Sequence, residues 1–237
     1  MTIMTPDQKQ RPKGWLSKIF GRKAKWWMKA LRTTVLIAGG LMVTDRLVLP
    51  NLPGRPLTRD ETAMLQDVYK DSIDLNKVRV HTSPMADVFL NWMGADAVAR
   101  DNLIYMSTTV DLHNYGAKNA EPYIQYALTH EAAHVWQHQN GVMPNIFHMT
   151  ALNVSRFFPG ADRHDDYRYS VLEGKDLLQY NIEQQASIIT DFTFAAKGTM
   201  PAIFENNVNA PKKDVQAGYE ATLKNFRANP SYPRNRP

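Results

Sequence analysis

The chain has 237 residues, contains no cysteine, is 43% hydrophobic and carries a formal net charge of +5. This length predicts one main domain with appendages, and the hydrophobic fraction suffices for an ordinary core. The absence of cysteine excludes disulfides and thiolate metal sites, so composition does not distinguish an oxidising from a reducing compartment.

The positive charge is concentrated in the first 44 residues, which hold nine Lys or Arg and one acidic residue, Asp7. The other 193 residues hold the remaining 19 of the 28 basic and 22 of the 23 acidic residues. The basic character therefore belongs to an N-terminal arm, residues 1–50. A nucleic-acid-binding function for the whole chain is disfavoured.

The arm also contains an uncharged, mostly apolar run from Thr33 to Thr44, which follows the tryptophan pair Trp26-Trp27. This combination is typical of a membrane-targeting element, although a spanning helix needs ~18 or more apolar residues. Three interpretations of residues 15–49 stay open: a signal anchor or export element, an interfacial amphipathic helix, and a helix packed against protein. Membrane association or export is expected rather than a purely cytoplasmic location.

A proline-rich linker, residues 51–57, separates the arm from the main domain, which we expect to span residues 58–228. Thr58 and Glu61 form a capping-box pattern that predicts a short opening helix. Further along the chain, Asn102–Val110 is rich in β-branched and aromatic residues and predicts a strand.

The next feature, His130-Glu-Ala-Ala-His134, is an HExxH motif. Histidines at i and i+4 lie one helical turn apart on one face, where both imidazoles can reach a single Zn²⁺. Glu131 beside them can act as a general base on a water molecule. The helix is predicted from Tyr123 to Gln139, and a strand followed by such a helix is the order expected of a zincin. In zincins an edge strand lines the cleft and aligns an extended peptide.

A catalytic zinc site of this kind needs a third protein ligand. His138 lies one turn beyond His134, but three ligands stacked along one straight helix cannot converge on one metal, which favours a surface or supporting role. Glu183 is the better candidate, because it lies beside the apolar stripe of a helix predicted over Asp176–Phe192. A charge in that position needs a partner. On spacing alone, a boundary glutamate of an amphipathic helix stays open as the alternative.

The remaining segments are interpreted as peripheral. His81 and His113 follow predicted strands and are expected in turns or at the surface. Residues 143–168 are expected to be irregular and to form a cleft wall. A solvated loop is favoured there over oxyanion stabilisation, for which the candidates are Tyr167, Tyr169 and His164. Residues 211–228 predict a final helix, and residues 229–237, with three prolines, predict a frayed tail.

Two blocks, His130–Gly141 and Tyr180–Ala186, resemble a group of bacterial zincin-like domains. The group comprises the Vgr-related (DUF4157-like) proteins, including metallopeptidase domains of some type VI secretion spike proteins. Arg55–Glu61 and Val68–Val80 resemble its opening helix and first strand. The resemblance implies an α+β, gluzincin-type fold with a small sheet, an HExxH helix and a second ligand-bearing helix. It also implies the zinc ligands His130, His134 and Glu183 and the catalytic acid/base Glu131.

These features together predict a zinc-dependent peptidase. The three ligands would hold Zn²⁺ with water in the fourth position, while Glu131 takes the proton of the attacking water and returns it to the leaving amine. The expected partners are a peptide or protein substrate and secretion-system components, in an effector or a processing protease. Two alternatives stay open: a non-catalytic, zinc-stabilised adaptor or loading module, and a membrane-associated scaffold that acts through its N-terminal arm.

Overall fold

The computed structural model describes residues 54–93, 95–110, 113–142, 167–198 and 211–235. The chain divides into two compact units, Met1–Asn51 and Leu52–Pro237, and the described residues lie in the second. The N-terminal arm with its three interpretations, His164 and most of residues 143–168 fall outside the described residues. Among the helices that are described, none combines the length and apolarity that crossing a membrane requires.

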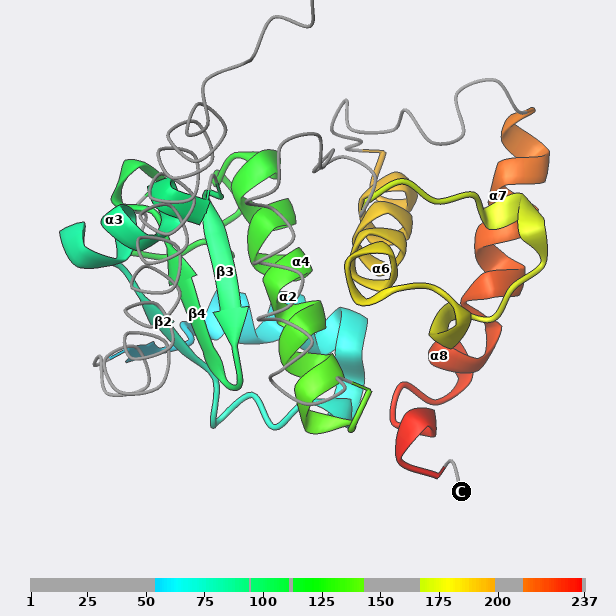
Figure 1. Ribbon diagram of the computed structural model, residues 1–237, viewed down its shortest axis with the longest axis horizontal. Coiled ribbons are helices and arrows are strands. Elements are labelled where there is room, and N and C mark those ends of the chain that lie inside the picture. Colours follow the sequence, from blue (N-terminus) through cyan, green and yellow to red (C-terminus); the bar gives the residue numbers. More distant parts are fainter. Residues whose placement is uncertain (1–53, 94, 111–112, 143–166, 199–210, 236–237) are drawn as a thin grey trace, which may run out of the picture. The chain divides into compact units, whose positions relative to one another are not determined.

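A four-stranded sheet contributes one layer of the second unit (Figure 1). Its order is β1 (Arg55–Pro56), β2 (Arg79–His81), β4 (Leu103–Met106) and β3 (Ala97–Arg100). β2 and β4 are parallel, and the other two pairs are antiparallel. The segment predicted as a strand over 102–110 is extended only to Met106, after which Thr108–Val110 forms a 3-10 helix. β4 is an internal strand, so the edge strand beside the HExxH helix is β3 instead.

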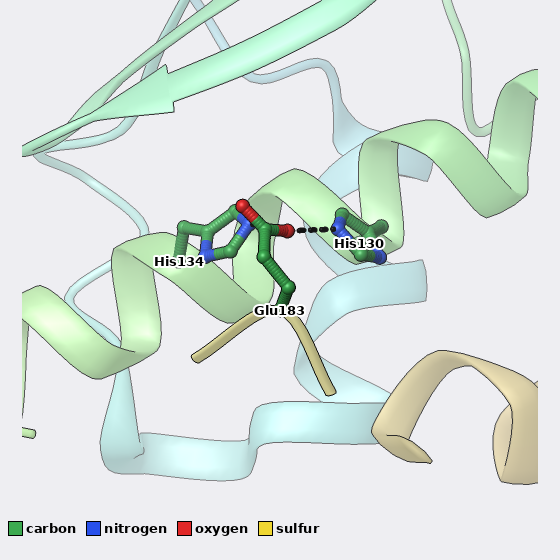
Figure 2. Close-up of side chains that lie close together, drawn as sticks. All are labelled: His130, His134 and Glu183. Atoms are coloured by element: carbon green, nitrogen blue, oxygen red, sulfur yellow. Dashed lines mark hydrogen bonds and ion pairs between the residues drawn. The ribbon is translucent and has the colours of Figure 1, made fainter. Parts of the chain in front are cut away.

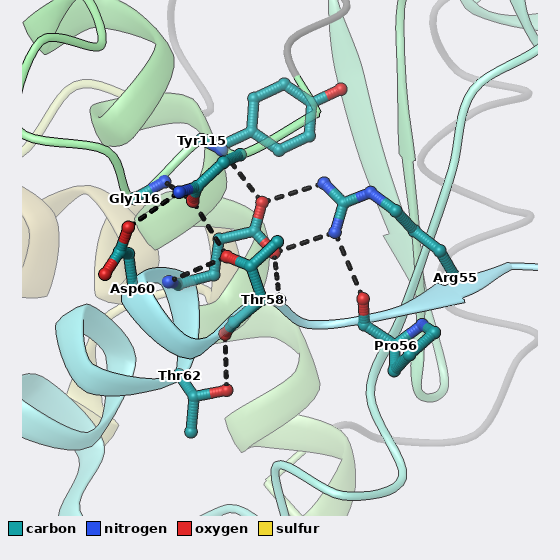
Figure 3. Close-up of polar contacts among 9 residues, drawn as sticks. Arg55, Pro56, Thr58, Asp60, Thr62, Tyr115 and Gly116 are labelled. Atoms are coloured by element: carbon teal, nitrogen blue, oxygen red, sulfur yellow. Dashed lines mark hydrogen bonds and ion pairs between the residues drawn. The ribbon is translucent and has the colours of Figure 1, made fainter.

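The opening helix, α2 (Arg59–Tyr69), begins at the predicted capping box. The Glu61 backbone N–H donates to the Thr58 hydroxyl, and the Glu61 carboxylate accepts from the Thr58 backbone N–H. The same carboxylate is fully buried and accepts two hydrogen bonds from Arg55 at 2.8 Å and one from the Tyr115 backbone N–H (Figure 3). Burial opposes ionisation, but these donors hold the pKa of Glu61 below its ordinary value. The capping residue Glu61 therefore also connects the start of α2 to β1 and to the segment that precedes the HExxH helix.

The HExxH motif lies on α4 (Pro122–Gln139), which confirms the predicted helix to within one residue. Gly141, with a φ of 69°, follows its end in the left-handed conformation that glycine tolerates. α4 packs against β3 and β4 and also against α6 (Ile182–Ala196), as Figure 1 shows. All residues from Leu128 to Gln137 are consequently buried. The motif thus lies on a helix enclosed by the sheet and a second helix.

The helix expected to carry the third ligand begins later than predicted. Leu177–Gln179 forms a 3-10 turn, and α6 starts only after Asn181. The side chain of Asn181 accepts from the Gln184 backbone N–H at 2.8 Å, while the Gln184 side chain accepts from the Asn181 backbone N–H at 3.1 Å. This capping box sets the helix start. Glu183 consequently lies in the first turn of α6 rather than in the middle of a longer helix.

The C-terminal segment differs from the prediction in two respects. The single helix expected over 211–228 is two helices, α7 (Lys212–Thr222) and α8 (Lys224–Ala228). The tail expected to fray is instead attached to the core. The indole N–H of the fully buried Trp136 donates to the Pro230 carbonyl at 2.8 Å, and Arg234 donates to the Ser72 carbonyl at 2.9 Å. A buried indole N–H needs an acceptor, and the tail supplies it.

Candidate metal centre

The three predicted ligands converge from two helices. His130 and His134 lie one turn apart on α4, and Glu183 reaches them from the first turn of α6, with its carboxylate between the two imidazoles (Figure 2). Glu183 Oε2 lies 3.4 Å from His130 Nε2 and 3.3 Å from His134 Nε2. The three ligand atoms are all within 4.8 Å of one another, and no other such group occurs among the residues that the structure describes.

The donor set and its spacing fit zinc. Nitrogen and oxygen ligands placed tetrahedrally ~2.0–2.1 Å from Zn²⁺ are themselves ~3.3 Å apart. The two separations involving Glu183 agree with this value. The three side chains are buried, with residue exposures of 9%, 5% and 8% for His130, His134 and Glu183. Two imidazoles and one carboxylate are a ligand set of catalytic zinc sites that leaves a fourth position open.

The charges in this cluster depend on one another. Burial alone would raise the pKa of Glu183, but His134 and His130 hold it well below its ordinary value. Burial alone would lower the pKa of His134, but the adjacent Glu183 and Glu131 raise it to about 9. In the metal-free protein, a proton on His134 therefore balances the carboxylate charge. Binding of a divalent cation would displace this proton, because a ligating imidazole is neutral.

Glu131 is buried beside the cluster and has the features of a proton-transfer group. Burial raises the pKa of its carboxyl group, an effect that His134, His130 and a backbone hydrogen bond from Ala99 partly oppose. Ala99 belongs to β3, the edge strand. The other carboxylate oxygen, Oε2, has no hydrogen-bond partner among the described residues. An unpaired buried oxygen is costly, and it is available to accept a proton from water or a substrate.

The structure separates the other candidates. His138 is exposed, with its Nδ1 3.5 Å from Asp101 Oδ1, in agreement with a surface role. His113 is exposed, as expected. His81, however, is buried, with its Nε2 2.8 Å from Ser83 Oγ and its ring against Tyr105, so its assignment to a turn or the surface was wrong. His81 is the last residue of β2, and its side chain faces the interior.

Of the two tyrosines considered for oxyanion stabilisation that are described, only Tyr167 lies near the histidines. It is exposed, and its ring centre is 6.1 Å from that of His130. Tyr169 was expected in a solvated loop, but it is buried. Its hydroxyl forms hydrogen bonds with Asp191 and Tyr219. The Tyr169 hydroxyl is therefore already engaged in buried hydrogen bonds with these two residues.

Each of the two histidines has a further side-chain contact that was not identified from the sequence. Tyr126 stacks on His130, and its hydroxyl donates to Asp191 at 2.7 Å. Burial raises the pKa of Asp191 to about 6. On the other histidine, His134 Nδ1 lies 2.9 Å from Gln137 Oε1. The only local signal for this contact is the three-residue spacing on one helix face.

This arrangement, an HExxH helix joined to a second helix through a glutamate and flanked by a mixed sheet, defines a candidate metal centre in an α+β domain. Residues 56–142 match the eCIS core domain family. The type VI secretion system spike protein VgrG2b of Pseudomonas aeruginosa strain PAO1 is 35% identical over 141 residues. That match covers 59% of this chain but 13% of the spike protein.

A solved structure extends this relationship to most of the chain. The effector domain of Pseudomonas aeruginosa VgrG2b superposes with a TM-score of 0.55 at 25% identity. The match covers 84% of this chain and 97% of the solved one. The relationship to the Vgr-related, type VI secretion group that the sequence blocks indicated is therefore confirmed. The similarity is to the effector part of that spike protein.

Proposed function

We propose that this chain is a zinc-dependent peptidase with a zincin-type fold. The observation that carries the proposal is the convergence of His130, His134 and Glu183 from α4 and α6, with the Glu131 carboxylate buried beside them. A structural zinc site would not require an acid next to the first histidine. The unpartnered Oε2 of Glu131 favours catalysis over the adaptor alternative.

In the proposed mechanism, His130, His134 and Glu183 would hold Zn²⁺. When bound, the metal would polarise the scissile carbonyl and lower the pKa of the attacking water. Glu131 takes the proton of that water at its free Oε2 and later delivers it to the leaving amine. Its raised pKa suits both steps, since a more basic carboxylate takes up the proton of water more readily, and a group whose pKa is nearer the working pH can serve as both acceptor and donor.

The edge strand β3 provides the proposed means of holding a substrate. It lies against α4 and ends the sheet among the described strands. An extended peptide added to this edge would run along the helix that carries the two histidines. A backbone hydrogen bond from Ala99 of β3 to Glu131 supports this proposal, because it brings the strand into direct contact with the residue proposed as the base. We therefore propose a peptide or protein as the substrate.

The proposed biological setting is based on the similarity to VgrG2b. Because VgrG2b is a spike protein of a type VI secretion system and the matching part is its effector domain, we propose that this chain is a secreted bacterial effector whose partners include secretion-system components. Membrane association through residues 15–49 stays a prediction, as does the boundary at residue 50. Within the expected linker, Arg55–Pro56 instead forms β1 of the sheet, and the segment after residue 228 contacts the core.

Hydrolysis of a peptide library by the zinc-loaded chain tests the proposal, with Glu131→Gln as the diagnostic variant. The amide cannot take up the proton, so turnover should fall ~10²–10⁴-fold while zinc content is unchanged. Glu220→Gln, an exposed glutamate on α7, is the matched control and should be fully active. Wild-type turnover in Glu131→Gln would refute Glu131 as the base. If the loaded wild type cleaves nothing but still binds zinc, the adaptor alternative gains support.

A further inference from the structure

A buried glutamine links the two helices that carry the cluster. Gln137 is fully buried on α4, three residues after His134. Its Oε1 lies 2.9 Å from His134 Nδ1, and its Nε2 donates to Ile182 O at 2.8 Å and to Gln185 Oε1 at 3.1 Å. One side chain thus contacts a candidate ligand on α4 and also the backbone immediately before Glu183 on α6.

The orientation of the Gln137 amide follows from its surroundings, because a backbone carbonyl can only accept hydrogen bonds. Ile182 O requires an N–H donor, so Nε2 faces α6 and Oε1 faces His134. The same reasoning orients Gln185, whose Nε2 donates to Tyr180 O at 2.8 Å and whose Oε1 therefore faces Gln137. Two main-chain carbonyls thus determine which way both amides point.

This orientation has a consequence for His134. An acceptor at Gln137 Oε1 requires a hydrogen on His134 Nδ1. A neutral imidazole has one N–H and one lone pair, so the lone pair is on Nε2. Nε2 is the atom that lies 3.3 Å from Glu183 Oε2 in the cluster. Histidines that bind metals are commonly held in this way, by an acceptor on the nitrogen that does not bind.

We propose that Gln137 is a positioning residue for the metal centre. It holds His134 with the Nε2 lone pair directed at the cluster, and the Ile182 carbonyl fixes the orientation of the amide that does so. The inference rests on the proposed function, since it requires that His134 binds a metal. Gln137 acts through His134, and both N–H groups and one acceptor position of its own amide are used by the three hydrogen bonds described above.

Zinc affinity, measured by competition with a chromophoric chelator, tests the proposal in the full chain. Gln137→Met keeps the side-chain length and removes all three hydrogen bonds. Its zinc affinity should fall ~10–100-fold, the usual effect of losing a supporting partner. Gln139→Met is the matched control. Gln139 lies on the same helix and donates to Asn102 at 2.8 Å without contacting the cluster, so its loss should leave the zinc affinity unchanged.

A second variant distinguishes positioning from a purely structural role. In Gln137→Glu, one carboxylate oxygen still accepts from His134 Nδ1, so zinc affinity should equal or exceed that of the wild type. The other oxygen faces Ile182 O and Gln185 Oε1, two acceptors, so the metal-free protein should unfold at lower denaturant concentration. A structural role would instead lower both quantities together. If Gln137→Met does not fold, the zinc affinity and stability of Gln137→Glu alone test the positioning role.

The outcomes separate this inference from the function beneath it. Wild-type zinc binding with unchanged affinity in folded Gln137→Met would overturn the positioning role alone. Parallel loss of affinity and stability in Gln137→Glu would overturn it as well. If the wild type itself bound no zinc, the proposed function would fail, and the role of Gln137 would fail with it.

Discussion

His134 Nε2 lies 3.3 Å from Glu183 Oε2, and this contact joins the HExxH helix to the capped first turn of α6. The Asn181 capping box places Glu183 at that position, and the buried α4 supplies the two histidines. A carboxylate and two imidazoles are thereby held together in the interior, where such groups need a charge-balancing partner. The proposed zinc ion would satisfy that need.

Zinc binding should discriminate between two histidines on the same helix. His134→Ala removes a buried ligand and should weaken zinc binding by more than the ~10–100-fold expected when only a supporting residue is lost. His138→Ala removes an exposed imidazole one turn further on and should leave the affinity unchanged. Isothermal titration of both metal-free variants makes the comparison. Equal losses would contradict the assignment of His134.

The pH dependence of stability should report on Asp191. Its pKa is raised by burial from 3.8 to about 6, so between these values the folded metal-free protein retains a proton that the unfolded chain has released. Stability therefore falls as pH rises through this window. Because Asp191→Asn does not titrate, the free energy of unfolding of the wild type relative to this variant should decline by about 2 kcal/mol from pH 4 to pH 7.

Denaturant unfolding of both proteins at several pH values, in the presence of a chelator, measures this difference. Groups other than Asp191 titrate in both proteins and cancel in the comparison. Parallel profiles for the wild type and Asp191→Asn would show that the carboxyl group is already ionised throughout the range, contrary to this account.

The C-terminal tail should contribute to stability. Deleting residues 229–237 leaves the buried Trp136 N–H without its Pro230 acceptor, which should cost about 1–3 kcal/mol. Trp136→Phe removes the donor, so the same deletion in that background should cost less. A thermodynamic cycle from urea unfolding of the four proteins tests this coupling. If the deletion had no effect on unfolding in either background, the tail would not be attached as described.

Local patterns in the sequence predicted α2 and α4 well, because a capping box and an HExxH helix bounded by Asn140-Gly141 are formed by near neighbours. Contacts between distant segments were harder to predict. Gln137 finds its acceptor at Ile182, and Trp136 finds its acceptor at Pro230, and both acceptors are backbone carbonyls that any residue provides. No residue type in the sequence therefore indicates either contact.

The position of Glu183 illustrates the same limit. Its place beside an apolar stripe indicated a charge in need of a partner, and the family resemblance implied the role of a ligand. The start of α6 at Asn181 determines the direction from which Glu183 approaches the two histidines. This helix start depends on the Asn181–Gln184 capping box. That pattern lies inside the segment interpreted as one continuous helix.

The measurement that tests the central claim most directly is the zinc content of the purified chain by elemental mass spectrometry, with Glu183→Ala and the control Glu220→Ala beside it. We predict about one zinc per chain in the wild type and the control, as expected for a single His2Glu site, and a sharp loss in Glu183→Ala. Absence of zinc from the wild type after metal has been supplied, or undiminished zinc in Glu183→Ala, would contradict the proposed metal centre.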